Sequence, residues 1–341
     1  MMFRKLLIAG VMTSALAVSF NQAQAADYTL RFSHQWPPVA GMQKDLFQVW
    51  ADTIAKESDG RIEVEMYPSA TLAAPPAQYE AVEDGIADVA AAIQGYTANR
   101  FPLTQVVELP GLIKNAAHGS CIIQSLYDEG LISDEYKGTR PLFLFTHGQG
   151  LLHTGDKLIA TPDDLAGLRI RRPTSVVANI LEAAGAQPLG MPAPESYQAM
   201  QLEVIDGVAL PWEGALAFRL NELAKAHTSV GDLYTLSFLV TMNEDSFEDL
   251  PEDLQDVITK NSGMAWSEKA GNLFDALDAK GLKQAQDAGH TFLTVEGGVD
   301  NPAWKPVLDK ATETYLADLE SRGLPARKVY ARAKELAATC K

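Results

Sequence analysis

The chain has 341 residues, with 44 acidic residues against 28 lysines and arginines, and its formal net charge is −16. This length exceeds one ordinary hydrophobic core and predicts two domains. The negative charge argues against nucleic acid or an anionic membrane surface as a partner. A small anionic ligand would therefore have to be captured by a local positive site.

Residues 1–25 have the pattern of a secretory signal peptide. Arg4 and Lys5 form a basic start, an apolar run follows, and Ala23-Gln24-Ala25 is a small-x-small cleavage site. The run is short for a membrane span, which leaves an uncleaved anchor as the less favoured alternative. We therefore expect export to the periplasm, a mature chain that begins near Ala26 with charge −18, and no direct membrane insertion.

Alternating apolar and polar residues predict a strand at Tyr28–Ser33, and His34, Gln35 and Trp36 follow it in a loop. Further along we expect a helix at 42–56, a strand at 61–67, a helix at 77–84 and a buried strand at 87–93. This alternation is typical of a sheet flanked by helices, in which ligands bind beyond the carboxyl ends of the strands. The loop residues His34, Trp36, Gln94 and Tyr96 are accordingly candidate ligand contacts.

A strand at 142–146 precedes His147-Gly148-Gln149-Gly150, where glycines separate two apolar segments. We predict a hinge and the first crossing between lobes near this point. Gln149 and His153 are candidate ligand contacts there.

The stretch from Gly167 to Leu210 carries the strongest signal. Leu168 to Arg172 alternates apolar and cationic residues until Pro173, which predicts a strand with Arg169 and Arg171 on one face. Arg172 is then either past the end of the strand or paired with an acid. A helix follows that ends at Gly185, then a helix from Pro194 through Met200, and an apolar strand at 208–210 after Asp206-Gly207.

Beyond this unit, Trp212 could line a pocket, and Glu213 could contact the ligand or cap the next helix, with the cap slightly favoured. A return to the first lobe is expected near 236–241. Helices are then expected at 251–260, 264–288, 304–321 and 325–338, with a strand at 291–295, and the helix at 264–288 is long enough to span both lobes.

Two cysteines, Cys121 and Cys340, remain in the exported chain. A disulfide that pins the C-terminal segment and a pair of buried free thiols are equally compatible with the sequence. The chain has no CxxC or Cys/His cluster, so we expect no metal site and no cofactor.

The order and spacing of the 167–210 stretch resemble the solute-binding subunit of tripartite ATP-independent periplasmic (TRAP) transporters, the DctP-like family. The shared features are a Gly-Leu-basic-Ile-Arg-x-Pro strand, a helix that ends in Ala-Gly-Ala, Met-Pro, Glu-x-Tyr-x-Ala and Asp-Gly. The resemblance implies that Arg171 pairs with the ligand's carboxylate. Arg172 and Leu210 depart from residues common in the family, and Leu210 with the aromatic residues favours an apolar or aromatic monocarboxylate over a C4-dicarboxylate. A sulfonate would satisfy the same arginine.

The sequence thus predicts an α/β, two-lobe periplasmic-binding-protein-like fold with a ligand cleft between the lobes. Lobe I would comprise 26–150 and 236–295, lobe II would comprise 151–235, and the helices at 300–341 would pack across both. The expected function is a monomeric receptor that delivers an organic acid to the small and large membrane subunits of a TRAP permease. A periplasmic sensor partner is an alternative, and a hydrolase is a weaker one, because no catalytic motif is found.

Overall fold

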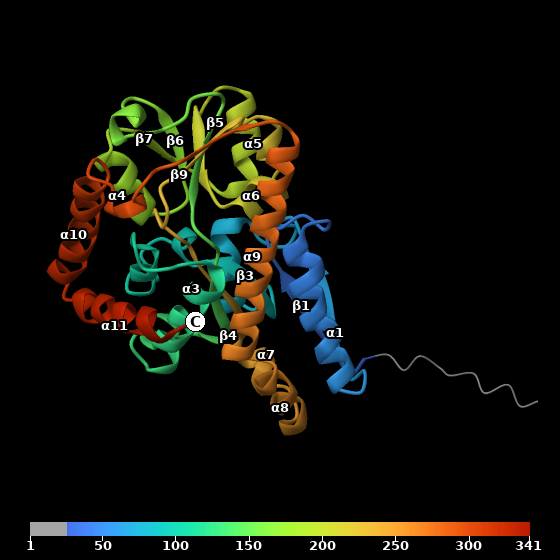
Figure 1. Ribbon diagram of the computed structural model, residues 1–341. Coiled ribbons are helices and arrows are strands. Elements are labelled where there is room, and N and C mark those ends of the chain that lie inside the picture. The colour runs from blue at the N-terminus through green and yellow to red at the C-terminus, as the bar shows by residue number, and fades with distance from the viewer. Residues whose placement is uncertain (1–25) are drawn as a thin grey trace, which may run out of the picture.

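The computed structural model describes residues 26–341 and contains two mixed sheets in separate lobes (Figure 1). The sheet of lobe I has five strands in the order β2-β1-β3-β10-β4, and the sheet of lobe II has six in the order β11-β9-β5-β8-β6-β7. The prediction of an α/β fold with two lobes is confirmed. The signal peptide predicted for residues 1–25 lies outside the described residues.

Lobe I is built from the strands β1 (Tyr28–Ser33), β2 (Ile62–Tyr67), β3 (Val89–Ile93), β4 (Thr139–Thr146) and β10 (Ser237–Asn243). β1 is parallel to β2 and β3, whereas β10 runs antiparallel to both β3 and β4. The carboxyl ends of β1, β3 and β4 therefore meet at one edge of the sheet, which faces lobe II. The helices of this lobe are α1 (Gln48–Glu57), which continues a π-helical segment at Met42–Phe47, α2 (Gln78–Glu83), α3 (Ala116–Asp128), α7 (Glu244–Glu248) and α8 (Glu252–Lys260).

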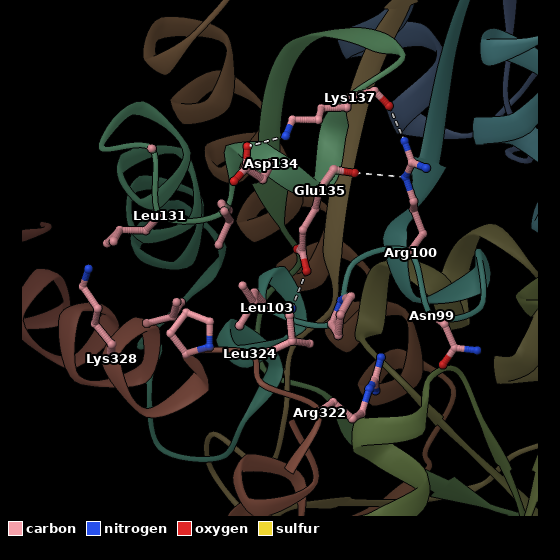
Figure 2. Close-up of a pocket in the computed structure, with 15 residues that line it drawn as sticks. Asn99, Arg100, Leu103, Leu131, Asp134, Glu135, Lys137, Arg322, Leu324 and Lys328 are labelled. Atoms are coloured by element: carbon pink, nitrogen blue, oxygen red, sulfur yellow. Dashed lines mark hydrogen bonds and ion pairs between the residues drawn. The ribbon is translucent and has the colours of Figure 1, made fainter. Parts of the chain in front are cut away.

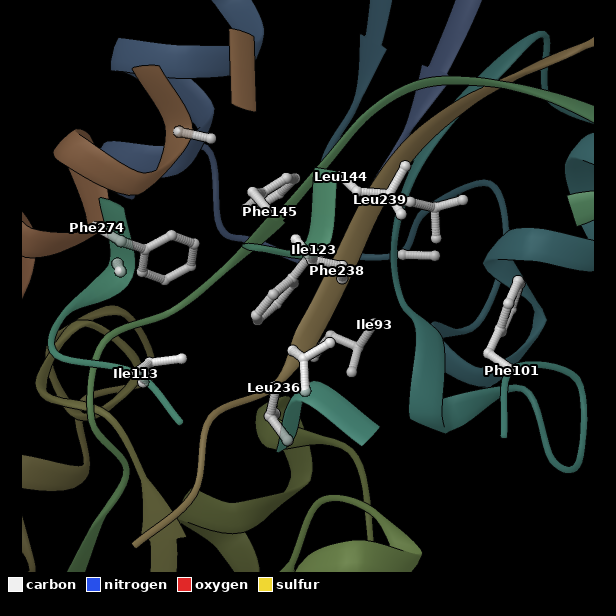
Figure 3. Close-up of a cluster of buried hydrophobic side chains, with 14 of the residues drawn as sticks. Ile93, Phe101, Ile113, Ile123, Leu144, Phe145, Leu236, Phe238, Leu239 and Phe274 are labelled. Carbon is white, nitrogen blue, oxygen red and sulfur yellow. The ribbon is translucent and has the colours of Figure 1, made fainter. Parts of the chain in front are cut away.

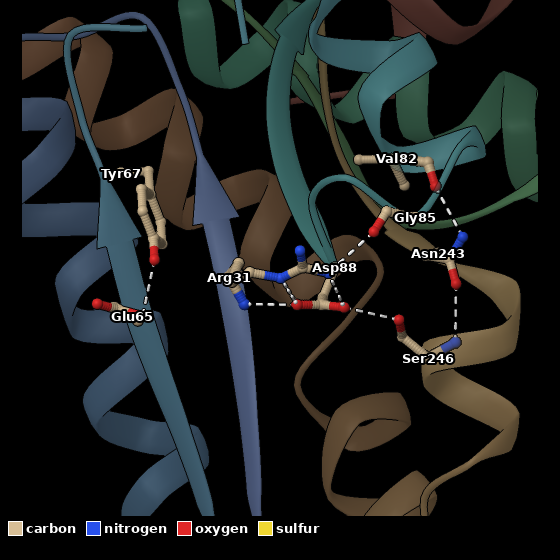
Figure 4. Close-up of polar contacts among 8 residues, drawn as sticks. All are labelled: Arg31, Glu65, Tyr67, Val82, Gly85, Asp88, Asn243 and Ser246. Atoms are coloured by element: carbon tan, nitrogen blue, oxygen red, sulfur yellow. Dashed lines mark hydrogen bonds and ion pairs between the residues drawn. The ribbon is translucent and has the colours of Figure 1, made fainter. Parts of the chain in front are cut away.

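A polar network closes the opposite end of this sheet (Figure 4). Arg31 Nε on β1 donates to Asp88 Oδ2 at 2.8 Å, and Ser246 Oγ on α7 donates to the other oxygen of Asp88 at 2.8 Å. Asn243 at the end of β10 donates to the carbonyl of Val82 and accepts from the backbone N–H of Ser246. These contacts cap α7 and tie it to strands that are far apart in sequence.

Lobe II contains β5 (Leu151–Thr154), β6 (Arg169–Arg172), β7 (Gln187–Gly190), β8 (Gly207–Leu210), β9 (Ala226–Ser229) and β11 (Thr291–Thr294), with helices α4 (Ser175–Ala183), α5 (Ser196–Gln201) and α6 (Trp212–Ala217). β6 is parallel to both β7 and β8. Gly185 has the expected left-handed conformation, with φ of 82°, after α4. The sequence did not predict β5, β7 or β9, each only four residues long. β7 contains Pro188, which an edge strand tolerates because its N–H is not needed for pairing.

The chain crosses between the sheets after β4 and again after β9, and α9 (Met264–Asp287) makes a third passage along both lobes (Figure 1). This 24-residue helix packs on α3 and β4 in lobe I and on α6 in lobe II. It leads to β11, which pairs with β9 in the sheet of lobe II. The prediction that residues 236–295 belong to lobe I is therefore wrong for β11. The last helices, α10 (Lys305–Ser321) and α11 (Ala326–Thr339), pack on α4 and α3, respectively.

Aromatic and aliphatic side chains together fill the core of lobe I up to the cleft (Figure 3). Phe145 on β4 stacks on Phe238 on β10, with ring centroids 5.2 Å apart and planes inclined by 11°. Phe274 of α9 packs on both rings. Because Phe238 also lies at the cleft, the same packing that stabilises the sheet fixes one wall of the site.

Candidate functional site

Arg171 is the centre of the candidate site and is completely buried, with 0% of its surface exposed. It lies near the carboxyl end of β6, between the neighbouring strands β7 and β8. Its Nε donates to the carbonyl of Met191 at 2.9 Å, and its Nη1 donates to the carbonyl of Ala209 at 3.0 Å. Within residues 26–341, no carboxylate lies within ion-pair distance of this guanidinium. A buried cation with no counter-ion is costly, so the arrangement favours an anionic ligand.

Tyr96 completes the surroundings of Arg171 from the other lobe. Its hydroxyl accepts a hydrogen bond from Arg171 Nη2 at 2.7 Å and another from the backbone N–H of Ala193 at 2.9 Å. Since both of these contacts use the oxygen as acceptor, the hydroxyl proton remains available for a ligand oxygen. Each Nη nitrogen of Arg171 also has a further N–H group. The arginine and the tyrosine can therefore hold one carboxylate together.

Further hydrogen bonds join the lobes beside this pair. Trp36 Nε1 after β1 donates to Glu213 Oε1 on α6 at 3.2 Å. Thr174, which follows β6, donates to Glu108 Oε2 at 2.8 Å, and the other oxygen of Glu108 accepts from Ser237 on β10. The lobes are therefore closed on each other around Arg171.

A small cavity with a volume of about 20 Å³ lies between the closed lobes, which is enough for about one water molecule, so the lobes must move apart to admit a larger ligand. Its walls are mostly apolar, with Arg171 and a few other polar groups exposed to the interior, a composition typical of small-molecule sites. The lining residues are Gln35, Trp36, Ile93, Tyr96, His147, Arg171, Ala193, Leu210, Pro211, Glu213, Gly214, Phe218, Leu236 and Phe238.

Glu213 is the acidic residue of this cavity, and its environment favours the neutral form. Burial raises the pKa of the Glu213 carboxyl to about 8, nearby Asp278 of α9 raises it as well, and the bond from Trp36 opposes the shift. Burial also raises the pKa of Asp278 to about 7, and its carboxylate accepts from the backbone N–H of Glu213 at 2.6 Å. A neutral Glu213 does not repel an anion held by Arg171.

This shift predicts that the affinity for an anionic ligand depends on pH. The raised pKa keeps Glu213 protonated below about pH 8, and as the pH rises through this value the new negative charge weakens anion binding. We expect the dissociation constant to rise by up to about tenfold per pH unit above this point. Titration calorimetry from pH 6 to 9 measures the slope.

Glu213→Gln is the matched variant, because its amide oxygen still accepts from Trp36 Nε1 but does not ionise. In this variant the dissociation constant should rise less steeply above pH 8. Any dependence on pH that remains near pH 7 is attributed to ionisation of Asp278. An affinity of the unsubstituted protein that stays constant over the whole range would contradict the role assigned to Glu213.

The structure brings together four of the predicted contacts, Trp36, Tyr96, Arg171 and Glu213, around the cavity. The slight preference for Glu213 as a helix cap is wrong, since α6 has no side-chain cap and this carboxyl accepts from Trp36 instead.

The remaining predicted contacts in lobe I do not line the cavity. His34 is buried in the core, where its ring packs on Phe47 and bonds to Gln43. Gln94 is also buried and donates to the hydroxyl of Tyr136. Both side chains point back into the lobe, although their loops lie at the cleft edge.

Trp212, Gln149 and His153 also lie elsewhere. Trp212 and Gln149 line a separate groove alongside α9. Trp212 is adjacent to Glu213 on α6, so the two side chains leave the helix in different directions. At this point the backbones of α6 and α9 are in close contact, because a Cβ at Gly281 of α9 would lie 2.4 Å from the Trp212 carbonyl oxygen. His153 bonds through Nδ1 to His227 at 2.7 Å and through Nε2 to the Leu210 carbonyl at 2.9 Å.

The other arginines of β6 have structural environments that differ from that of Arg171. Arg169 forms an ion pair with Asp206 at the start of the strand, with Nε 3.0 Å from Oδ2. Arg172 belongs to β6 and has no ion-pair partner among residues 26–341, so both alternatives predicted for it are wrong. A Cβ at Gly190 would lie only 2.9 Å from Arg172 Cζ, which shows that this side chain packs over β7.

Sequence reasoning did not select Gln35, His147, Leu236 or Phe238 as contacts. Gln35 and His147 lie in the two predicted cleft loops at 34–36 and 147–150, in which the sequence favours other residues as contacts. Leu236 and Phe238 have no signal beyond an apolar strand.

A larger hollow lies away from the cleft, between lobe I and the C-terminal helices (Figure 2). Its volume is about 720 Å³, and it is lined by Arg100, Lys137, Arg322 and Lys328 among other residues. Arg100 already donates to the backbone carbonyls of Glu135 and Lys137, and Lys137 Nζ lies 3.0 Å from Asp134 Oδ1. Size alone would favour this hollow, but the buried cation without a counter-ion favours the cleft.

The fold and the site define a class, the two-lobe solute-binding proteins. No helix within residues 26–341 is long and apolar enough to cross a membrane. The profile of the family described as bacterial extracellular solute-binding protein, family 7 (DctP) matches residues 32–317, and the chain belongs to this family.

Several proteins are similar over almost the whole chain. A TRAP solute-binding protein from Rhodoferax ferrireducens T118, in complex with copurified benzoate, is 36% identical over 91% of this chain and 98% of its own, with a TM-score of 0.87. A marine metagenome TRAP solute-binding protein specific for aromatic acid ligands, with 3-hydroxybenzoate, is 34% identical over 93% and 100%, with a TM-score of 0.89. The C4-dicarboxylate-binding periplasmic protein DctP of Rhodobacter capsulatus is 28% identical over 90% and 92%. The predicted resemblance to the TRAP solute-binding subunit is thereby confirmed.

Proposed function

We propose that this protein captures an aromatic or similarly apolar monocarboxylate between its lobes and delivers it to a TRAP permease. The observation that carries the proposal is Arg171, a fully buried cation with no acid partner among residues 26–341, bonded to Tyr96 of the other lobe. A carboxylate supplies the missing negative charge and matches the planar geometry of the guanidinium.

The walls of the cavity support the apolar part of the proposal. Trp36, Phe218 and Phe238 present aromatic rings, and Ile93, Leu210 and Leu236 add aliphatic surface. Among residues 26–341, Arg171 is the only cationic side chain that lines this cavity, so a second carboxylate would find no equivalent partner. The similar proteins with benzoate and 3-hydroxybenzoate bind acids of this kind.

Delivery to a permease fits the TRAP solute-binding subunits that this chain resembles. The receptor would act as a monomer in the periplasm after cleavage behind Ala25, as the pattern of residues 1–25 predicts. Opening of the closed lobes would require the contacts between Trp36 and Glu213 and between Tyr96 and Arg171 to break.

A thermal-shift screen of organic acids tests the proposal. A ligand present at a hundred times its dissociation constant stabilises the folded protein by about 2.7 kcal/mol, which corresponds to a rise in Tm of about 5 °C. We expect benzoate and related aromatic acids to give such a rise and succinate to give none. A response to succinate but to no aromatic acid would refute the proposed ligand class.

A further inference from the structure

The cavity has polar groups that a simple apolar carboxylate leaves without partners. Gln35 Oε1 and His147 Nε2 both belong to buried side chains, with exposures of 4% and 0%. Neither atom has a hydrogen-bond partner among the described residues, and both residues line the cavity that contains Arg171. Buried polar atoms are nearly always bonded, so a ligand group is expected to meet them.

The hydrogen-bond chemistry of His147 determines what kind of group this is. Its Nδ1 bonds to the carbonyl of Gly148, and a carbonyl oxygen only accepts, so the ring proton is on Nδ1. Burial lowers the pKa of His147 to about 3, which keeps the ring neutral at ordinary pH. Nε2 is therefore an unprotonated acceptor. Thr235 holds the loop in place by donating to the His147 carbonyl at 2.7 Å.

Both acceptors lie on the lobe I wall, whereas Arg171 belongs to lobe II. The ring centroid of Phe238 lies 5.9 Å from that of His147 and 5.9 Å from that of Trp36, which is the neighbour of Gln35. Aromatic surface therefore extends between the two loops that carry these acceptors. A flat ligand body packed on Phe238 would bring its substituents toward Gln35 or His147 while lobe II holds its carboxylate.

We propose that the site selects a ring-hydroxylated aromatic carboxylate, with the ligand hydroxyl donating to His147 Nε2 or Gln35 Oε1. This inference rests on the proposed function and refines its ligand class. The hydroxyl satisfies an acceptor that benzoate leaves unpaired, and a site built to bond a hydroxyl discriminates against the analogue that lacks it. Such a ligand contacts polar groups of both lobes and would stabilise the closed form.

Titration calorimetry with benzoate, its three monohydroxylated isomers and the corresponding methoxybenzoates tests the inference. We expect at least one hydroxylated isomer to bind at least about tenfold more tightly than benzoate, which corresponds to about 1.4 kcal/mol. Its methoxy analogue should lose this gain, because it has the same oxygen but no proton to donate.

His147→Phe should reduce the ratio of the benzoate and hydroxybenzoate dissociation constants to within about threefold, and Gln35→Leu provides the same test if the first variant does not fold. His290→Phe is the matched control, because this histidine lies outside the cavity and bonds to His227; it should preserve the ratio. The inference would be overturned if benzoate and all its hydroxylated isomers bound equally, or if the ratio of their dissociation constants stayed unchanged in both cavity variants. Either result would leave the proposed function intact. If no aromatic carboxylate binds but another apolar monocarboxylate does, the inference alone fails; if neither kind binds, the proposed function fails and the inference fails with it.

Discussion

Arg171→Ala is expected to weaken binding of the cognate acid by about thirty-fold to several thousand-fold. The variant leaves the ligand's carboxylate in a closed site without its charged partner, and truncating one member of a buried charge pair costs about 2–5 kcal/mol. It also removes the bond to Tyr96, through which Arg171 links the two lobes. Calorimetric titration of the cognate ligand measures the loss.

Two further substitutions separate charge from geometry. Arg171→Lys keeps the positive charge but not the planar fork that reaches the carbonyls of Met191 and Ala209, so we expect binding to remain clearly impaired. Tyr96→Phe keeps the aromatic ring and removes only the hydroxyl that bonds to Arg171 and Ala193. We expect it to weaken binding by less than Arg171→Ala does.

Matched controls come from the same strand. Arg169→Ala removes an ion pair with Asp206 that is partly exposed, and Arg172→Ala removes a side chain that packs over β7, so each should change the affinity little. Because Arg171 is fully buried, circular dichroism and Tm without ligand must show that its variants fold. A folded Arg171→Ala protein that binds within about threefold of the original would exclude this residue as the carboxylate partner.

The sequence predicted the elements with strong periodicity and missed those without it. The strand at Arg169–Arg172 and the left-handed turn at Gly185 have local signals, an alternation that ends at a proline and a glycine after a helix. β5, β7 and β9 are four-residue strands whose pairing depends on neighbours far away in the sequence. β11 shows the same limit, because only its contact with β9 places it in lobe II.

The candidate site shows a similar division. The sequence placed the right loops at the cleft, since the carboxyl ends of parallel strands share one edge. Which side chain of a loop enters the cavity depends on packing, and His34 and Gln94 turn into the core while their neighbours Gln35 and Tyr96 face Arg171's cavity. Glu213 has no sequence signal for its raised pKa, because that shift arises from burial and from Asp278 on a helix 65 residues away.

Replacing both cysteines is expected to destabilise the fold while leaving ligand affinity unchanged. The structure joins Cys121 of α3 to Cys340 after α11, with Cα atoms 5.9 Å apart and a sequence separation of 219 residues. The alternative of two free thiols is thereby overturned. The bond holds the last helix against lobe I, away from the cleft, where His118 Nε2 also bonds to the carbonyl of Ala337 at 2.9 Å.

The size of the effect follows from the length of the closed loop. A disulfide restricts the unfolded chain more as the loop grows, and removal typically costs about 2–5 kcal/mol, so a separation of 219 residues places the expectation near the upper end. Cys121→Ala/Cys340→Ala should lower the free energy of unfolding in urea by this amount, and reduction of the original protein should reproduce the loss. Calorimetry on the folded double variant should give the original affinity, because neither cysteine contacts the cavity. A change below about 0.5 kcal/mol, or two alkylatable thiols in the unreduced, denatured protein, would show that the cross-link does not stabilise the fold.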